Sequence, residues 1–114
     1  MKNLYLNFYR DARSKKNALG AVDPISQQLL HLIALKNIDN KPMTVTEAMS
    51  LSEVGGPATI YRKLDKLRNA NLIEIVFMGS NRRTKYLVTS KSVNIYFDKL
   101  SEVMIKSVDA FRSI

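Results

Sequence analysis

The chain has 114 residues, of which 46% are hydrophobic and 25% are charged, so it can form one folded domain with a modest core and is not a disordered chain. Eighteen basic and ten acidic residues give a net charge of +8, which favours nucleic acid as a partner over the alternative of a basic surface that only aids solubility. The absence of cysteine excludes a disulfide framework and thiolate metal sites. No apolar run reaches the roughly 18 residues of a membrane span, and the start lacks a signal peptide, so we expect a cytoplasmic protein.

Two helices are predicted in the first third of the chain. Residues 2–18 form a helix, and a second one starts at Asp23-Pro24, an N-cap followed by proline at the first helical position, and runs to about Asn37. His31, the only histidine, has no second ligand or nucleophile near it in the sequence, so we assign it a structural place and no role. The apolar stripes of the two helices are Leu4, Tyr5, Phe8, Tyr9 and Ala12 in the first and Ile25, Leu29, Leu32 and Ile33 in the second.

A helix–turn–helix is predicted next. A turn at residues 39–42 leads into a short strand, Met43–Val45, and then a helix from Glu47 to Leu51 that is capped by Thr44 or Thr46. A glycine-containing turn at residues 51–56 then opens a helix over residues 57–69. Its buried stripe is Ile60, Leu64 and Leu67, whereas Ala58, Arg62, Asp65 and Asn69 face the opposite way.

The hydrophobic period then changes to that of strands, at residues 72–78 and 84–88, with Gly79-Ser80-Asn81 as the turn between them. Thr89 or Ser90 caps a long final helix that runs to the end of the chain. The predicted fold class is mainly α with a small β-hairpin (α+β), a winged helix–turn–helix. We expect a single domain over residues 1–114, with its core at 23–89 and dimerisation helices at 1–20 and 90–114.

This order of elements resembles the MarR-type winged-helix regulators over about Asp23 to Phe97. The stretch that runs from Pro57 to Leu67 and continues to Leu72-Ile73 is similar to the recognition helix of that family and to its exit into the wing. The resemblance implies a homodimeric DNA-binding transcriptional regulator. In that family, many members bind small aromatic effectors between the dimerisation helices and the DNA-binding lobe, so a small-molecule effector is possible here.

The wing resembles that of the same family. Ser80-Asn81-Arg82, with Thr89 seven residues after Arg82, is similar to the family pattern Asp-x-Arg ending in Leu-Thr-x-x-Gly. Here Ser80 replaces the Asp, Val88 the Leu and Ser92 the Gly. In the family, the Asp holds the wing arginine for the minor groove. Ser80 has no carboxylate with which to hold the arginine in this way, so Arg82 and Arg83 are both candidates for the minor-groove contact.

The positive charge gathers on the predicted helix and hairpin, where residues 57–85 carry seven basic and two acidic residues, a net +5. Arg62 has the planar fork that bonds bidentately to guanine in the major groove. Ala58 and Thr59 could meet a thymine methyl, and Thr59 could equally bond a phosphate. Lysines on the helix flanks are typical phosphate contacts, and Tyr61 could either pack or contact a phosphate. The predicted DNA-binding residues are Ala58, Thr59, Tyr61, Arg62, Lys63, Lys66, Arg68, Asn81, Arg82, Arg83 and Lys85.

The terminal helices carry more apolar residues than one neighbouring helix would cover, which favours a homodimer. The alternative is that the two helices pack on each other within one monomer. The predicted dimer interface consists of Leu4, Phe8, Tyr96, Leu100, Val103, Met104, Val108 and Phe111.

The sequence therefore predicts a sequence-specific regulator of transcription that binds double-stranded DNA as a homodimeric repressor. Two alternatives stay open: a winged helix used for protein contacts, and a replication or recombination accessory factor. An enzyme is not expected, because no second ligand or nucleophile stands near the single histidine in the sequence and the acidic residues have neither metal-ligand nor paired-carboxylate spacing. We predict no cofactor and no metal site.

Overall fold

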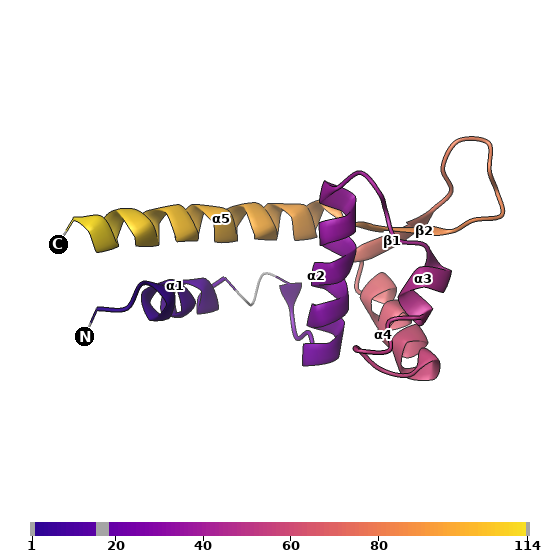
Figure 1. Ribbon diagram of the computed structural model, residues 1–114, viewed down its shortest axis with the longest axis horizontal. Helices are drawn as coiled ribbons and strands as arrows, with labels where there is room; N and C mark the ends of the chain where they lie inside the picture. Colours follow the sequence, from indigo (N-terminus) through magenta and orange to yellow (C-terminus); the bar gives the residue numbers. More distant parts are fainter. Residues whose placement is uncertain (1, 16–18, 114) are drawn as a thin grey trace. The chain divides into compact units, whose positions relative to one another are not determined.

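The computed structural model describes residues 2–15 and 19–113 and forms two compact units. The first, Met1–Ala21 with Lys91–Ile114, contains helices α1 and α5, which we call the helical pair; the second, Val22–Ser90, is the winged-helix unit (Figure 1). The elements in chain order are α1 (Leu4–Arg13), α2 (Pro24–Ile38), α3 (Val45–Met49), α4 (Pro57–Asn69), β1 (Ile73–Val76), β2 (Tyr86–Thr89) and α5 (Lys91–Arg112). The predicted fold class, mainly α with one hairpin, is confirmed.

Helix α4 has the bounds that the sequence predicts. Gly56 is its N-cap and Pro57 its first residue, where the fixed φ of proline suits a helix and its missing N–H costs nothing. The helix ends in a Schellman motif, in which the N–H of Leu72 donates to the carbonyl of Leu67 at 3.0 Å and Asn71 takes a φ of 60°. The predicted stripe of Ile60, Leu64 and Leu67 is buried.

Helix α2 begins after Asp23, whose carboxylate accepts the N–H of Ser26 at 2.9 Å, and also ends in a Schellman motif, with Asn40 at a φ of 57°. Its buried face is shifted from the predicted one. Leu29 and Ile33 are buried as predicted, but Leu30 and Ala34 are also buried, whereas Ile25 and Leu32 are half-buried. A helix packed on more than one side buries a wider face than a single stripe indicates.

The predicted strand at Met43–Val45 is wrong, and so is the predicted start of the following helix at Glu47. Pairing with the hairpin is limited to one isolated bridge, between Thr44 and Tyr86, which is flanked by backbone hydrogen bonds of Met43 and Val45, and α3 already begins at Val45. The cause is a capping box: the Thr44 hydroxyl accepts the N–H of Glu47 and the Glu47 carboxylate accepts the N–H of Thr44, both at 3.0 Å. Thr44 is thus the cap, and the backbone turns into the helix before a strand can extend.

Strands β1 and β2 pair antiparallel, with Ile73 opposite Thr89 and Val76 opposite Tyr86. Both are shorter than predicted, and residues 77–85, which we call the wing, form the loop between them (Figure 1). Asn37 ties α2 to this hairpin: its Nδ2 donates to the Leu87 carbonyl at 3.1 Å, and its Oδ1 accepts the Thr89 N–H at 2.8 Å and the Thr89 hydroxyl at 3.1 Å. Thr89, one of the two predicted caps of the last helix, therefore belongs to β2.

Helices α1 and α5 of the helical pair lie side by side (Figure 1). Helix α1 starts two residues later than predicted, because the side chain of Asn3 caps it by accepting the Leu6 N–H at 2.9 Å, and it ends at Arg13. Residues 16–18 of the predicted first helix and residue 114 of the last lie outside the described residues. Among the helices described here, none is long and apolar enough to cross a membrane.

Candidate nucleic-acid interface

One face of α4 is exposed along its length, opposite the buried stripe. Ala58 and Arg62 are exposed, as is Tyr61, with 62% of its surface accessible. Thr59 is half-buried, and its hydroxyl accepts from the Arg62 guanidinium at 3.4 Å, a long hydrogen bond that a better acceptor would replace. The helix thus holds a planar cationic fork, with a methyl group and a phenol near it, on a rigid element.

The two lysines of α4 face an acidic partner on α2. The Nζ atoms of Lys63 and Lys66 lie 3.3 and 3.1 Å from the same carboxylate oxygen of Asp23. The side chains of Lys63 and Asp23 are only 27% and 24% exposed, whereas that of Lys66 is 56% exposed. The N–H of Ser26, then its hydroxyl and the two ammonium groups, hold the pKa of Asp23 well below its ordinary value against the opposing effect of burial. Both lysines are predicted phosphate contacts, and here both are engaged within the protein.

The side chain of Asn81 organises the tip of the wing. Its Oδ1 accepts the N–H groups of Arg83 at 2.9 Å and Thr84 at 3.3 Å, and its Nδ2 donates to the Thr84 hydroxyl at 3.2 Å. Such an Asx-turn fixes the backbone that carries Arg82 and Arg83. Asn81 is a predicted DNA contact, and in this structure its amide is used to shape the loop.

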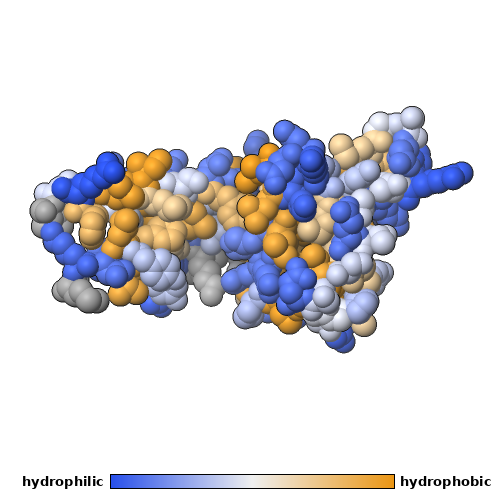
Figure 2. Space-filling model, viewed as in Figure 1, coloured by the Kyte–Doolittle hydropathy of each residue, from blue (hydrophilic) through white to orange (hydrophobic). Residues whose placement is uncertain are grey.

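The two wing arginines lie in different surroundings. The Arg82 guanidinium lies over the ring of Phe77, 5.7 Å from its centroid, so the side chain rests on an aromatic face at the start of the wing. Arg83 is also exposed and lines a recess at the base of the wing. Lys85 is exposed as well, and Figure 2 shows hydrophilic residues at the surface of the wing.

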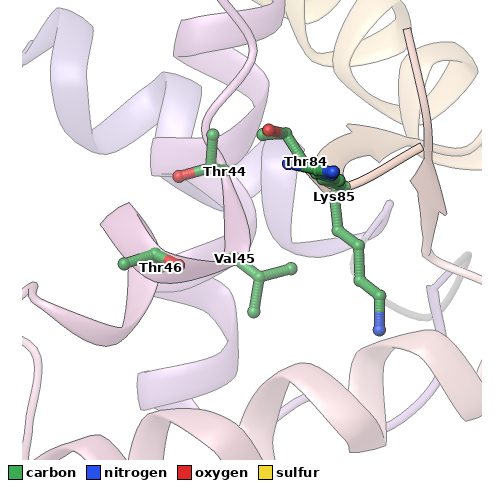
Figure 3. Close-up of a pocket in the computed structure, with 6 residues that line it drawn as sticks. Thr44, Val45, Thr46, Thr84 and Lys85 are labelled. Carbon is green, nitrogen blue, oxygen red and sulfur yellow. The ribbon is translucent and has the colours of Figure 1, made fainter. Parts of the chain in front are cut away.

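This wing-root recess has a volume of about 440 Å³ and is lined from two elements. Figure 3 shows Thr44, Val45 and Thr46, at the start of α3, facing Thr84 and Lys85, where the wing returns to β2. A hydrogen bond from the Val45 N–H to the Lys85 carbonyl, at 3.0 Å, fixes the two sides together. The recess therefore offers two cationic side chains and several hydroxyls to an anionic group.

Sequence reasoning missed the threonines of this recess. The Thr44-x-x-Glu47 spacing indicates a capping box and could have singled out Thr44, rather than Thr46, as the cap of this helix. No local pattern could have shown that this helix start lies beside Thr84 and Lys85, because the contact is between segments about 40 residues apart in the sequence.

The helical pair carries a second candidate surface. Of the predicted interface residues, Val103 is buried and Leu4, Phe8, Tyr96, Leu100 and Val108 are half-buried, whereas Met104 and Phe111 are 54% and 40% exposed. Further apolar residues outside the predicted interface are exposed as well: Leu6, Ile95 and Ile105, together with Tyr5 and Tyr9 of the predicted stripe of the first helix. Figure 2 shows hydrophobic residues at the surface over both helices.

A largely apolar recess of about 470 Å³ lies between α1 and α5. Phe8 and Met104 line it from opposite helices, and the Ser107 hydroxyl, also in its lining, is buried without a hydrogen-bond partner. A buried hydroxyl without a partner is unfavourable by roughly 1–3 kcal/mol, so a group that reached it from outside the helical pair would gain from the contact.

Within residues 2–15 and 19–113, no three His, Cys, Asp or Glu side chains form a group that could hold a metal ion. His31 is exposed on α2, with its Nδ1 2.7 Å from the Gln27 carbonyl one turn back.

No protein-family model matches the chain, and no curated protein matches its sequence. The solved structures to which the chain is similar in fold include two of PefR. Apo (heme-free) PefR has a TM-score of 0.47 at 18% sequence identity, over 89% of this chain and 89% of that one. The heme sensor protein PefR from Streptococcus agalactiae in complex with heme has a TM-score of 0.49 at 16% identity, over 96% of this chain and 78% of that one. Both similarities are weak, so the function proposed below rests on this chain's own residues.

Proposed function

We propose that the protein is a sequence-specific regulator of transcription of the MarR type, which binds double-stranded DNA by placing α4 in the major groove. The observation that carries the proposal is the exposed face of α4, where Arg62 projects from a helix whose other face is buried. The major groove of B-DNA admits one α-helix and presents a distinct pattern for every base pair. The guanidinium of Arg62 matches guanine O6 and N7, and the long bond to Thr59 is exchanged for that contact.

The wing supplies contacts beside the major groove. A narrow minor groove attracts arginine, and the Asx-turn of Asn81 holds Arg82 and Arg83 ready for it. A backbone phosphate fits the wing-root recess, where Arg83 and Lys85 supply charge. Arg68, exposed on α4, is a further phosphate contact.

We propose that the helical pair joins two copies into a homodimer. Two helices alone enclose only a small core, and apolar side chains such as Tyr5, Met104 and Ile105 remain at least half exposed on them. A second copy of the pair covers these side chains. Two-fold symmetry then places the two α4 helices on half-sites about 10 bp, or a multiple of that, apart. Occupying such a site beside a promoter makes the dimer a repressor.

Selection of bound duplexes from a random pool, at low and at higher salt, tests the DNA proposal. We expect an enriched inverted repeat that persists at the higher salt. Binding that disappears steeply with salt and enriches no sequence would contradict it, because only the phosphate term would remain. That outcome would favour an accessory factor of replication or recombination, and an absence of duplex binding would favour a protein-contact module.

Sedimentation at micromolar concentration tests the dimer. We expect the wild type to sediment as a dimer and Met104→Glu and Ile105→Glu to sediment as monomers, because a charge would have to be buried in the interface. Lys106→Glu is the matched control, since Lys106 is exposed on the same turn of α5 and should leave the dimer intact. A wild type that sediments as a monomer contradicts the proposal.

A further inference from the structure

Asp23 is a single carboxylate that faces both lysines of the DNA-reading helix. It caps α2 through its bonds to the N–H and hydroxyl of Ser26, both at 2.9 Å, so its position is fixed by its own helix. From that position one of its oxygens lies 3.3 Å from the Lys63 Nζ and 3.1 Å from the Lys66 Nζ. These contacts join residues about 40 positions apart, and with the side chain of Asp23 only 24% exposed they are partly shielded from solvent.

The consequence concerns DNA phosphates. Non-specific binding comes almost entirely from cations that neutralise phosphates and release counterions. An ammonium group bonded to Asp23 has to give up this partner, wholly or in part, before it can serve a phosphate. Asp23 therefore lowers the contribution of Lys63 and Lys66 to the affinity for DNA, and it does so for every DNA sequence alike. The guanidinium of Arg62, which reads bases, has no acidic partner among the described ion pairs.

We propose that Asp23 is a specificity-determining residue, which competes with the DNA backbone for Lys63 and Lys66 and so restrains non-specific binding. The inference rests on the proposed function. It assigns to α2, which does not itself read bases, control over the ratio of specific to non-specific affinity.

The test is Asp23→Asn, measured by fluorescence anisotropy on a random-sequence duplex over a series of salt concentrations. Asparagine is as good an N-cap as aspartate, so the start of α2 is kept while the charge is removed. We expect tighter non-specific binding and a slope of log K against log salt that is steeper by up to about 1.8, which is two phosphates at 0.9 each. Between 50 and 200 mM salt, a slope steeper by 1.8 means that Asp23→Asn loses roughly 12-fold more affinity than the wild type loses over the same range.

Asp39→Asn is the matched control. Asp39 is exposed at the other end of α2, about 24 Å from Asp23 by the helical rise of 1.5 Å over 16 positions, and its replacement changes the net charge by the same amount. We expect the slope of this variant to equal that of the wild type. If it steepened as much as Asp23→Asn, net charge alone would be responsible and the proposal would be overturned.

A second substitution tests the coupling directly. Lys66→Gln should flatten the slope by about 0.9 in the Asp23→Asn background and clearly less in the wild type, because Asp23 engages the ammonium group only in the wild type. An equal effect in both backgrounds, or a wild-type slope for Asp23→Asn, overturns the proposal. Thermal melts establish that each variant is folded, and Asp23→Ser, another good N-cap, provides the same charge removal if the asparagine variant is not. Failure of the proposed function is distinct, since the wild type itself would then enrich no sequence from the random pool or would not bind duplex DNA at all.

Discussion

The hydrogen bonds of Asn37 should make this residue one of the main contributors to the stability of the winged-helix unit. Its half-buried amide makes three hydrogen bonds, at 2.8 to 3.1 Å, to residues of β2. At about 0.5–1.5 kcal/mol each, these bonds contribute roughly 1.5–4.5 kcal/mol. Alanine recovers about 0.5 kcal/mol because it has the higher helix propensity. The difference is about 1–4 kcal/mol, and from the middle of that range we expect Asn37→Ala to lower the free energy of unfolding by about 2–3 kcal/mol.

Urea unfolding followed by circular dichroism measures this change, and on heating the midpoint should fall by about 10–20 °C. Lys36→Ala, at the exposed neighbouring position, is the control and should stay within about 0.5 kcal/mol of the wild type. Thr89→Val removes the hydroxyl that donates to Asn37, so its effect should be smaller in the Asn37→Ala background than alone. If Asn37→Ala lowered the free energy of unfolding by less than about 0.5 kcal/mol, the reasoning would be refuted, because the three hydrogen bonds would then be no more favourable than hydrogen bonds to water in the unfolded chain.

Arg62→Ala should weaken binding to the selected duplex by about 1–3 kcal/mol and relax the preference at one base pair, as selection from a random pool would show; an unchanged preference would refute the assigned register of α4. Asn81→Ala should weaken binding to the same duplex by about 1 kcal/mol and speed hydrogen exchange of the Arg83 amide, because the Asx-turn is lost. The neighbouring Ser80→Ala should have neither effect. The pKa values of Asp23 and Glu47 are lowered in the folded state, chiefly because their carboxylates accept the backbone N–H groups of Ser26 and Thr44, respectively. The stability that these carboxylates contribute is therefore present above their ordinary pKa values and is lost as the pH falls below about 4. Acid unfolding curves check this sign, and Asp23→Asn should reduce the loss.

The sequence predicted the bounds of α4 because every local signal there agrees. Gly56 and Pro57 favour a helix start, Ile60, Leu64 and Leu67 recur at helical spacing, and Asn71 suits the left-handed conformation that ends the helix. Around Thr44 the local signals conflict, since a β-branched run favours a strand while the spacing of Thr44 and Glu47 favours a cap. The cap satisfies two backbone N–H groups at once, and the helix therefore begins earlier than predicted.

The candidate site was predictable only as a set of residue types on the exposed face of α4 and on the wing. What each side chain contacts depends on partners far away in the sequence. Asp23 meets Lys66 across 43 residues, and Asn37 meets Thr89 across 52. Hydrophobic periodicity reports which face of an element is buried and carries no information about which polar groups meet between elements. The prediction that Lys63 and Lys66 contact phosphates therefore could not include the carboxylate that faces both.

The exposed wing also makes the chain cleavable at a defined place. Arg82 and Arg83 stand in an exposed loop, where trypsin cuts most readily, whereas β2 beyond it is paired with β1 and bonded to Asn37. We expect a single cut there to leave two fragments that remain associated through these bonds, with the winged-helix unit still folded. Protection of the two arginines from trypsin then becomes a direct reporter of whatever occupies the wing.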